Sequence, residues 1–478
     1  MTESFRRFRN SSIDDKLSYV ILLGLSAFLF LAYLLSAFRS MVNADAGYYL
    51  GVTELIHNGY VPYKDFGLNY TPLFFYVLQL SRLFMGAYPS YTGYMLFLYL
   101  IAAIDAFLLS IIVYRIKHSI RFAWFSALVF LLLYFYLDGA YFILETFSLC
   151  CGLISMSLLV GRKTSFWNCF FSGVCCALAF LSKQYGLLFA GFVGAFLLFS
   201  NNGWKCRIAN CFYALIGFCV ILVLFVSLFA LSGVSVNALV SALSGSTYGG
   251  QSWKMLVEGG VKACRLFPFL LFVPCVLFSW SSDNRCLAWA CCTGLLLASL
   301  QFYFNVFPHY YIYMLPFVLV LNALLWKRFK TGNEANVRFL LFWGMLFTAC
   351  VIPLQGAFKD TKTLIKHDSR APQENAVKQL RQMVQEYGVE SALCYNTVPY
   401  YALCPLTPSA MVKYGFSFGD DTEETYLERL KEADCFVVHQ GELDDLGNMT
   451  KLVQELEDVF ILLEDHFSDG IRVFIRQE

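Results

Sequence analysis

The sequence predicts a mostly α-helical, polytopic membrane protein with a small α/β domain at its C-terminal end. The membrane part follows from composition, because 58% of the 478 residues are hydrophobic and only 14% are charged, against roughly 25% charged residues in soluble domains. It also follows from apolar stretches of about 17–25 residues, each long enough to cross a bilayer as a helix. The α/β domain follows from a change after residue 357, where charged helical patterns alternate with short β-rich runs.

The apolar stretches predict roughly eleven transmembrane helices. These are expected at residues 17–38, 91–114, 122–138, 140–160, 165–182, 185–200, 209–231, 266–281, 286–303, 311–326 and 338–356. Cytoplasmic loops carry an excess of Lys and Arg, and alternate loops of this chain are basic: "RIKHSIR", "GRK", "GWKCR", "DNR" and "KRFK". A cytoplasmic N-terminus places all of them inside, so the other loops and the tail are expected outside.

The first external segment, residues 39–90, is expected to hold two helices near the membrane surface. Tyr49, Val52 and Ile56 share one face at helical spacing, so one helix begins near Asp45. The apolar run at 72–86 is short. If it crossed the membrane, every later loop would move to the opposite side, and the basic loops would no longer be cytoplasmic. It is therefore predicted to lie in the outer interface.

The tail divides the chain into a membrane domain, residues 1–357, and an extracytoplasmic α/β domain, residues 358–478. Strands are expected near 391–396, 435–439, 459–464 and 470–476, and helices near 373–386, 423–433 and 445–458. The tail has no Gly-rich phosphate loop and no catalytic constellation. Cys394, Cys404 and Cys435 lie in it and could pair, whereas cysteines inside the apolar runs are expected to be small buried hydrophobes.

The net charge and the spacing of the cysteines limit the classes of partner that the chain is expected to bind. The net charge is +1, so bulk charge gives no reason to expect a nucleic-acid partner. No Cys or His spacing typical of zinc appears, so no metal ligands are assigned. Membrane lipid is the partner that the composition implies.

Two acids, Asp45 and Asp65, flank the Tyr-rich stretch that follows the first span. Asp45 could simply cap the helix that starts there, since Asp is a preferred N-cap residue. Asp65, in the turn-like "YKDFGLNYTP", could be a solvated loop acid. A carboxylate pair at a membrane surface also suits deprotonation of an alcohol or retention of a cation. With a reference pKa near 4, Asp would accept the proton late in the transition state.

Further polar residues occur at the outer ends of later spans. Lys183 and Gln184, in "FLSKQYGLLF", are either a snorkelling helix end or a ligand pair for the phosphate of a lipid carrier. His309 and Tyr310, in "VFPHYYIYMLP", are level with them, although aromatic residues there can be belt residues. Glu145 lies just inside a span, where ionisable groups are functional by default.

These candidates share one predicted membrane face. Asp105 lies in the middle of a span and, like Glu145, could be functional for that reason, but it suits helix packing equally well. The residues mapped to the outer face are Asp45, Asp65, Glu145, Lys183, Gln184 and His309. They are expected to line one water-accessible hollow.

Four segments of the sequence resemble those of a known family. "DAGYYLGVTELIHNGYVPYKDFGLNYTPLFFYVLQL", "LETFSLCCGLIS", "FLSKQYGLLF" and "PHYYIYMLP" resemble the polytopic GT-C-fold glycosyltransferases, near the protein O-mannosyltransferase and aminoarabinose (lipid A) transferase branch. The resemblance covers about residues 15–330. It implies an enzyme of the bacterial inner (plasma) membrane that moves a sugar from a polyprenyl-phosphate donor to an extracytoplasmic acceptor, which is a cell-envelope glycan, lipid or protein.

The resemblance also implies roles for individual residues. Asp45 matches the catalytic acid of the first external loop, and Asp65 is taken as its catalytic partner. The donor phosphate is assigned to Lys183, Gln184, His309 and Tyr310, and the substrate cleft to Glu145, Asn69 and Tyr70. Single displacement is expected, with Asp45 accepting the acceptor's proton while Lys183 and Gln184 hold the leaving phosphate.

Two positions depart from the family pattern. Ala46 stands where many relatives carry a second acid, which leaves dependence on a divalent cation open. Thr71 stands where a Lys precedes the Pro, so the phosphate relies more on Lys183.

Two other functions stay open on the sequence alone. One is a transporter or lipid flippase with an external binding domain, which predicts polar residues near the midplane such as Asp105. The other is a polysaccharide polymerase or ligase that uses diphosphate-linked donors. The sequence does not specify the sugar or the acceptor.

Overall fold

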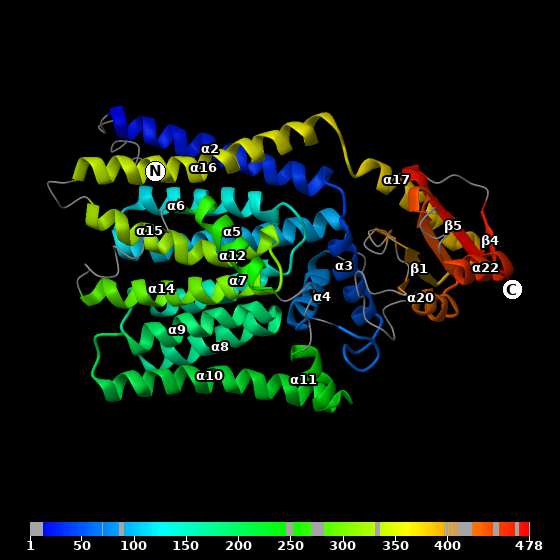
Figure 1. The fold of residues 1–478 in the computed structure, drawn as a ribbon, viewed down its shortest axis with the longest axis horizontal. Helices are drawn as coiled ribbons and strands as arrows, with labels where there is room; N and C mark the ends of the chain where they lie inside the picture. The colour runs from blue at the N-terminus through cyan, green and yellow to red at the C-terminus, as the bar shows by residue number, and fades with distance from the viewer. Residues whose placement is uncertain are drawn as a thin grey trace.

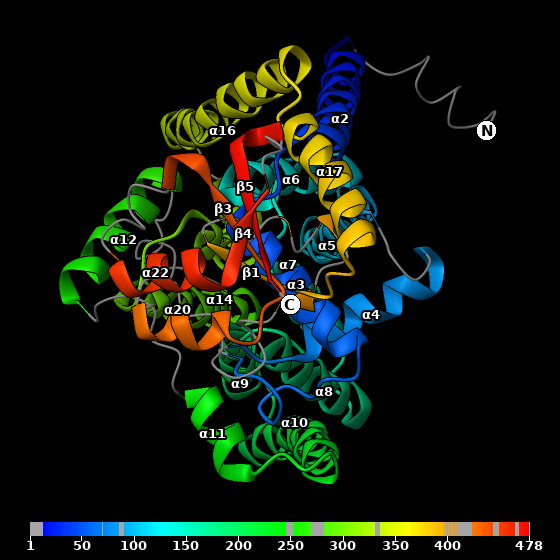
Figure 2. The same ribbon diagram turned by 90° about the vertical axis from the view of Figure 1, so that its right-hand side faces the viewer.

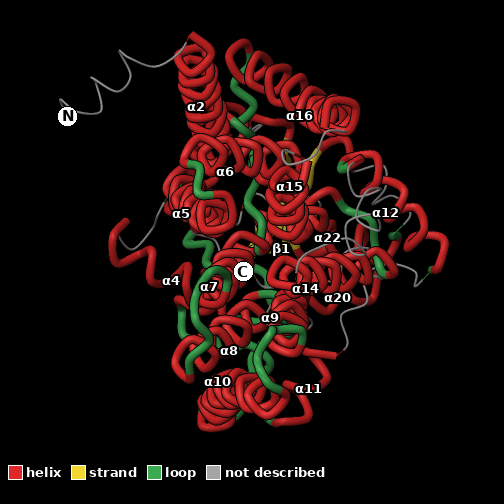
Figure 3. The backbone as a smooth tube through the Cα atoms, turned by 90° about the vertical axis from the view of Figure 1, so that its left-hand side faces the viewer, coloured by secondary structure: helices red, strands yellow, loops and turns green. Residues whose placement is uncertain are grey.

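The protein is a long helical bundle with a small sheet-bearing part beyond one end (Figure 1). The computed structural model describes residues 13–68, 70–85, 90–244, 252–268, 282–329, 335–395, 397, 400, 403–404, 407–408, 423–442, 449–463 and 468–477. Seen from the end far from the sheet, the bundle helices run nearly parallel to the line of sight (Figure 3). This arrangement confirms the predicted mostly α fold with a C-terminal α/β part.

The bundle is built from helices that match the predicted spans. They are α2 (Ile13–Arg39), α5 (Tyr91–Lys117), α6 (Ile120–Tyr134), α7 (Glu145–Leu159), α8 (Phe166–Ser182), α9 (Leu188–Leu198), α10 (Trp204–Leu231), α14 (Ser282–Leu300), α15 (Leu315–Phe329) and α16 (Ala335–Lys366). Most of the predicted span 266–281 lies outside the described residues. Among the described residues, six helical segments are long and apolar enough to cross a membrane. The chain is an integral membrane protein.

Burial distinguishes the inner helices from the lipid-facing ones. In the apolar segment Pro308–Leu325, 89% of the residues are buried, against 17% in the most apolar part of α10. The segment Pro308–Leu325 therefore lies inside the bundle, between α5, α6, α14 and α16. α10 turns most of its apolar side chains outward, as a lipid-facing helix does.

The first external segment folds into α3 (Ala44–His57) and α4 (Leu73–Met85). α3 begins where the sequence predicts, but the alternative in which Asp45 merely caps it does not hold. Asn43 is the N-cap residue, and its side chain accepts a hydrogen bond from the Ala46 amide at 2.9 Å. The reason is positional, since Asp45 lies one residue inside the first turn.

α4 has the one-sided exposure of a helix at a membrane surface. Phe74, Phe75 and Leu78 are fully buried, whereas Leu83 and Phe84 are 78% and 87% exposed. Such large apolar side chains are stable in that position when a membrane covers them. The predicted interfacial placement of residues 72–86 fits this pattern.

The tail forms a five-stranded sheet in the order β2-β1-β3-β5-β4. The strands are β1 (Ser391–Tyr395), β2 (Thr407–Pro408), β3 (Cys435–His439), β4 (Phe460–Leu462) and β5 (Ile471–Arg476), and the helices are α17 (Ala371–Tyr387), α20 (Glu423–Leu430) and α22 (Thr450–Val459). β1 is parallel to β2 and β3, whereas β5 is antiparallel to β3 and β4. The predicted strands and helices of the tail are confirmed.

Both faces of this sheet are covered, which explains the apolar runs of its strands. Ala392 and Val437 pack toward α17 and the first external segment, whereas Leu393 and Phe436 pack toward α20 and α22. Cys394, Cys404 and Cys435 are buried on the first of these sides and are all free thiols. The domain division at 357/358 stays a prediction, and α16 runs past it to Lys366.

A buried arginine joins the tail to the start of the first external segment. Arg370 is only 1% exposed; its Nε donates to the Ser40 carbonyl at 3.0 Å, and its Nη1 donates to Thr92 Oγ1 at 2.5 Å. Gln373 accepts from the Val42 amide at 2.9 Å and donates to the Val42 carbonyl at 3.1 Å. We call these bonds the Arg370 joint.

Replacing Arg370 by Ala is expected to loosen this joint. The Ser40 carbonyl and the Thr92 hydroxyl would each lose a charged donor in a buried place, which costs about 3 kcal/mol in total. Unfolding in detergent, followed by tryptophan fluorescence, and protease cleavage between α16 and α17 measure the effect. Arg381→Ala is the control, because this residue of the same helix donates a single exposed bond to the Leu403 carbonyl. Equal stability of the two variants would contradict the expectation.

Candidate active site

A group of charged side chains gathers where the bundle meets α3. Glu145 is the first residue of α7, and Lys183 lies between α8 and the short helix η2 (Gln184–Leu187). Asp138 belongs to the turn η1 (Phe135–Gly139), and His309 belongs to η5 (Pro308–Met314). Asp45 belongs to α3 and approaches this group from the side of the sheet. α3 lies between the bundle and the sheet (Figures 1 and 2).

A buried ion pair forms the centre of this group. Lys183 Nζ lies 2.5 Å from Glu145 Oε1, and the two side chains are 4% and 1% exposed. His309 Nε2 lies 3.9 Å from the same Glu145 oxygen, and its Nδ1 lies 3.4 Å from Asp138 Oδ2. His309 therefore stands between two carboxylates, one on each side of its ring.

Asp45 lies within electrostatic range of the whole group. Burial raises the pKa of Asp45 above its ordinary value, while the nearby His309 and Lys183 act to lower that pKa. Glu145 and Asp138 act in the same direction as burial. The result is a carboxylate that binds a proton more readily than an exposed Asp, which suits a general base.

Tyrosine rings enclose the Lys183 ammonium. Its Nζ lies 5.4 Å from the ring centroid of Tyr70, 5.8 Å from that of Tyr310 and 6.0 Å from that of Tyr185. The rings of Tyr185 and Tyr310 meet edge to face with centroids 5.2 Å apart. Aromatic faces attract a cation and also fix its place.

Local backbone geometry positions Lys183. α8 ends because Lys183 is extended, with φ −156° and ψ 136°, and its carbonyl accepts from the Gly186 amide at 2.8 Å. η2 can then fold back closely on α8 because residue 186 has no side chain. A Cβ at Gly186 would lie 2.2 Å from the Ala179 carbonyl oxygen.

Gly186→Ala is therefore expected to displace η2 and to misplace Lys183. A contact of that length with backbone cannot be relieved by a rotamer change, so the expected loss of stability is about 1–3 kcal/mol. Thermal unfolding of the purified protein measures it. The control is Gly194→Ala in α9, where nothing lies within 4 Å of the added Cβ. A Gly186 variant as stable as the control would show that the segment yields without cost.

Asp138 is a site residue that the sequence reasoning missed. It has φ +68° in the turn between α6 and α7, a conformation that non-glycine residues seldom adopt but that Asp tolerates. Such strain is often kept at functional sites. The signal in the sequence is the Asp-Gly dipeptide of "LDGA", which indicates a turn but not a site residue.

Asp65 is not brought into the group. Its Oδ2 accepts a hydrogen bond from the Val61 amide at 2.7 Å and so closes its own turn. It is also absent from the principal charges that act on Asp45. The structure therefore assigns Asp65 a part in shaping the loop, and the pairing with Asp45 stays unsupported.

The remaining predicted residues are distributed as follows. Gln184 begins η2 directly beside Lys183, and Tyr310 and Tyr70 contribute two of the enclosing rings. Asn69 lies outside the described residues. Asp105 is fully buried beside Cys150 inside the bundle. Within the described ranges, no three His, Cys, Asp or Glu side chains are arranged to hold a metal ion.

Comparison with known proteins finds similar folds among solved structures. No family model matches the chain, and no curated protein sequence matches it. Among solved structures, ArnT from Cupriavidus metallidurans bound to undecaprenyl phosphate is similar with a TM-score of 0.63 and 14% identity, over 95% of this chain and 97% of that one. The apo structure of the same ArnT has a TM-score of 0.61 and 14% identity, over 96% and 98% of the two chains.

A weaker likeness, with a TM-score of 0.49 and 10% identity, is to the oligosaccharyltransferase of Archaeoglobus fulgidus, over 86% of this chain and 69% of that one. At such identities the comparison with ArnT speaks to the fold, and it covers both the bundle and the tail. The chain has the GT-C fold of the membrane glycosyltransferases, as its sequence resemblance predicted.

Proposed function

We propose that this protein is a membrane glycosyltransferase that moves a sugar from a polyprenyl-phosphate donor to an extracytoplasmic acceptor by single displacement. The observation that carries the proposal is the approach of Asp45, on α3, to Lys183 and His309 at the bundle ends. A base and an anion-binding group thus occupy one site. The ArnT structure with undecaprenyl phosphate supports the class of donor, because the two folds are similar over nearly their full lengths.

Asp45 is the group that removes the acceptor's proton. The acceptor hydroxyl oxygen forms a bond to the anomeric carbon while its proton passes to the Asp45 carboxylate. The bond between the anomeric carbon and the donor phosphate oxygen breaks, and its electron pair leaves with polyprenyl phosphate. Burial, which raises the pKa of Asp45, makes the carboxylate a better match for this proton transfer.

Lys183 stabilises the charge on the departing phosphate. An ammonium has three donors, and Glu145 engages one of them. The other donors are those that would contact the phosphate, and the ion pair and the tyrosine rings fix the position of the side chain. Such preorganised charge is the usual source of large rate acceleration. His309, whose Nδ1 lies beside Asp138 Oδ2, adjoins Lys183, as do Gln184 and Tyr310.

The pH dependence follows from the raised pKa of Asp45. A general base works only when deprotonated, so transfer should fall as the pH drops through this pKa, at a value above 3.8. His309→Gln removes a positive charge that lowers the pKa, so this acid limb should move to higher pH. Profiles of kcat/KM against pH measure both. His57→Gln, at the exposed end of α3, is the control and should leave the limb in place; a downward shift for His309→Gln would contradict the assignment.

The membrane orientation forms part of the proposal. Glu145 and Lys183 lie at the ends of α7 and α8 that face α3 and the tail, whereas the basic connection with Arg162 and Lys163 lies at the opposite ends. Basic loops favour the cytoplasmic side. This arrangement supports an extracytoplasmic site and α/β tail, and the membrane that we propose is a bacterial inner membrane.

The function is tested with purified protein in nanodiscs, polyprenyl-monophosphate donors carrying radiolabelled hexoses or pentoses, and cell-envelope extracts as acceptors. The expected result is a labelled covalent product and free polyprenyl monophosphate identified by mass spectrometry. Release of a polyprenyl diphosphate would show a polymerase or ligase instead. Passage of label across sealed vesicles without a covalent product would show a transporter or flippase.

A further inference from the structure

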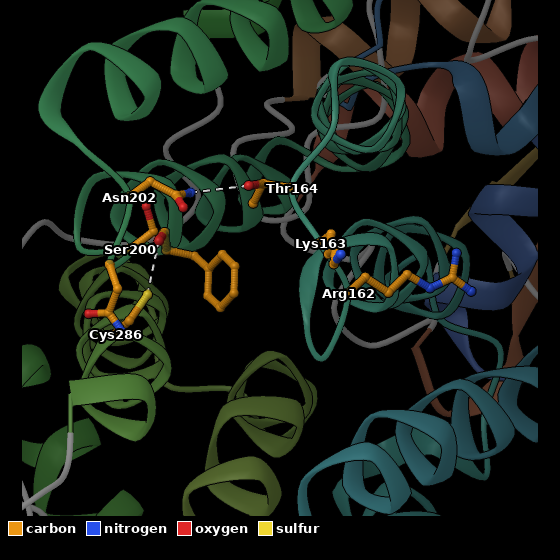
Figure 4. A pocket seen from close by; sticks show the side chains of 8 residues that line it. Arg162, Lys163, Thr164, Ser200, Asn202 and Cys286 are labelled. Atoms are coloured by element: carbon orange, nitrogen blue, oxygen red, sulfur yellow. Dashed lines mark hydrogen bonds between the residues drawn. The ribbon is translucent and has the colours of Figure 1, made fainter.

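A cavity of about 450 Å³ opens at the end of α7 and α8 opposite to the candidate active site. It lies where the α7–α8 connection meets the α9–α10 connection and the start of α14 (Figure 4). Its polar lining includes Arg162, Lys163, Thr164, Ser200, Asn202 and Cys286. No residue of this lining is acidic.

Hydrogen bonds hold the walls of the cavity together. Asn202 Nδ2 donates to Thr164 Oγ1 at 3.1 Å, which ties the two connections to each other. Arg207 Nε donates to the Asn202 carbonyl at 2.7 Å, and its Nη1 donates to the Leu198 carbonyl at 3.1 Å. The Cys286 thiol donates to the Phe196 carbonyl at 3.0 Å. The cavity is therefore a built feature of these loops.

The charged side chains in the described lining of the cavity are both positive. Arg162 and Lys163 form no ion pair within the described residues, and Arg115 lies close enough to Arg162 for the two like charges to interact. Cations gathered without a carboxylate raise the local concentration of anions. Arg and Lys beside amide and hydroxyl groups are the side chains that bind phosphate.

Exposed aromatic residues place the cavity at the membrane boundary. The same helix ends expose Phe166, Trp167, Phe199, Trp204 and Trp289. Exposed Trp residues at the ends of transmembrane helices sit at the level of lipid headgroups. A phosphate held in this cavity would therefore be at the depth of a phospholipid headgroup, with apolar helix surface beside it for acyl chains.

We propose that this cavity binds the phosphate headgroup of an anionic phospholipid from the leaflet opposite to the candidate active site. Lys163 contacts the phosphate, Arg162 adds positive charge at the rim of the cavity, and the Asn202 and Thr164 side chains line the polar part of the headgroup site. Basic pockets between helices on the cytoplasmic side are suited to such headgroups. The site is separate from the proposed transfer reaction, since it lies at the other end of the same helices.

Native mass spectrometry of the full-length protein tests this proposal. The protein is purified in the presence of equal amounts of phosphatidylglycerol and phosphatidylcholine, and the lipids that remain bound are counted. Retention of phosphatidylglycerol over phosphatidylcholine is expected, and Arg162→Ala/Lys163→Ala should reduce that preference about tenfold. The matched control is Lys117→Ala/Arg121→Ala, which removes two cations from the same end of the bundle outside the cavity.

Three results would overturn the proposal. The first is an equal loss of phosphatidylglycerol in the two double variants, which would reflect general surface charge. The second is an undiminished preference in the cavity variant. The third is displacement of the bound lipid by millimolar inorganic phosphate, which would assign the cavity to a soluble phosphate compound. Thermal unfolding of both double variants verifies that each is folded before lipids are counted.

Discussion

Asp45→Asn is expected to lower the rate of sugar transfer by about 10²–10⁴-fold, the usual contribution of a positioned general base. The amide keeps the size of the side chain but cannot accept the acceptor's proton. Lys183 and Glu145 remain paired, so binding of polyprenyl phosphate should change little. Single-turnover transfer and a separate carrier-binding measurement distinguish the two effects.

Asp65→Asn is the matched control for this experiment. Asp65 closes its own turn through the Val61 amide, and an Asn oxygen can accept the same bond. Transfer by this variant should therefore stay within a few-fold of the wild type. A large loss in Asp65→Asn with full activity in Asp45→Asn would reverse the assignment of the base.

Breaking the buried Lys183–Glu145 pair should give the other large effect. Removing one partner leaves an uncompensated charge in a buried place, which costs about 3–5 kcal/mol. Lys183→Gln and Glu145→Gln are each expected to destabilise the protein to this extent. The double variant should recover most of the stability, because two neutral amides can bond to each other, but it should not recover sugar transfer.

Chemical unfolding of the two single variants and the double variant gives the coupling energy of the pair, and transfer is assayed on the same samples. The exposed pair Glu258–Lys262, with Nζ and Oε1 2.9 Å apart in α12 (Trp253–Leu266), is the control. Neutralising Glu258 should change neither quantity, since solvent screens surface pairs. Recovery of transfer in the double variant at Lys183 and Glu145 would exclude Lys183 as the phosphate ligand.

Much of the fold could be predicted because its signals are local. Long apolar runs and basic loops are legible in the sequence, and the tail strands match their β-rich runs. The shared sidedness of Glu145, Lys183 and His309 is also legible, since all three lie at span ends.

The pairings within the site could not be predicted. The Lys183–Glu145 contact depends on the rotation of α7 and α8 about their axes, which the apolar pattern of a largely buried helix does not define. Asp138 acts through a left-handed turn conformation, for which "LDGA" gives only a weak hint. The sequence alone leaves capping by Asp45 open, because Asn43, an equally good capping residue, stands only two positions earlier.

The Arg370 joint has a consequence for biogenesis. The turn just before Asp45 receives its hydrogen bonds from a residue 330 positions later in the chain. Nearly all of the bundle must therefore be synthesised and inserted into the membrane before these hydrogen bonds can form. In a nascent chain α3 lacks this anchorage, so the protein is expected to reach its final arrangement only when synthesis is well advanced.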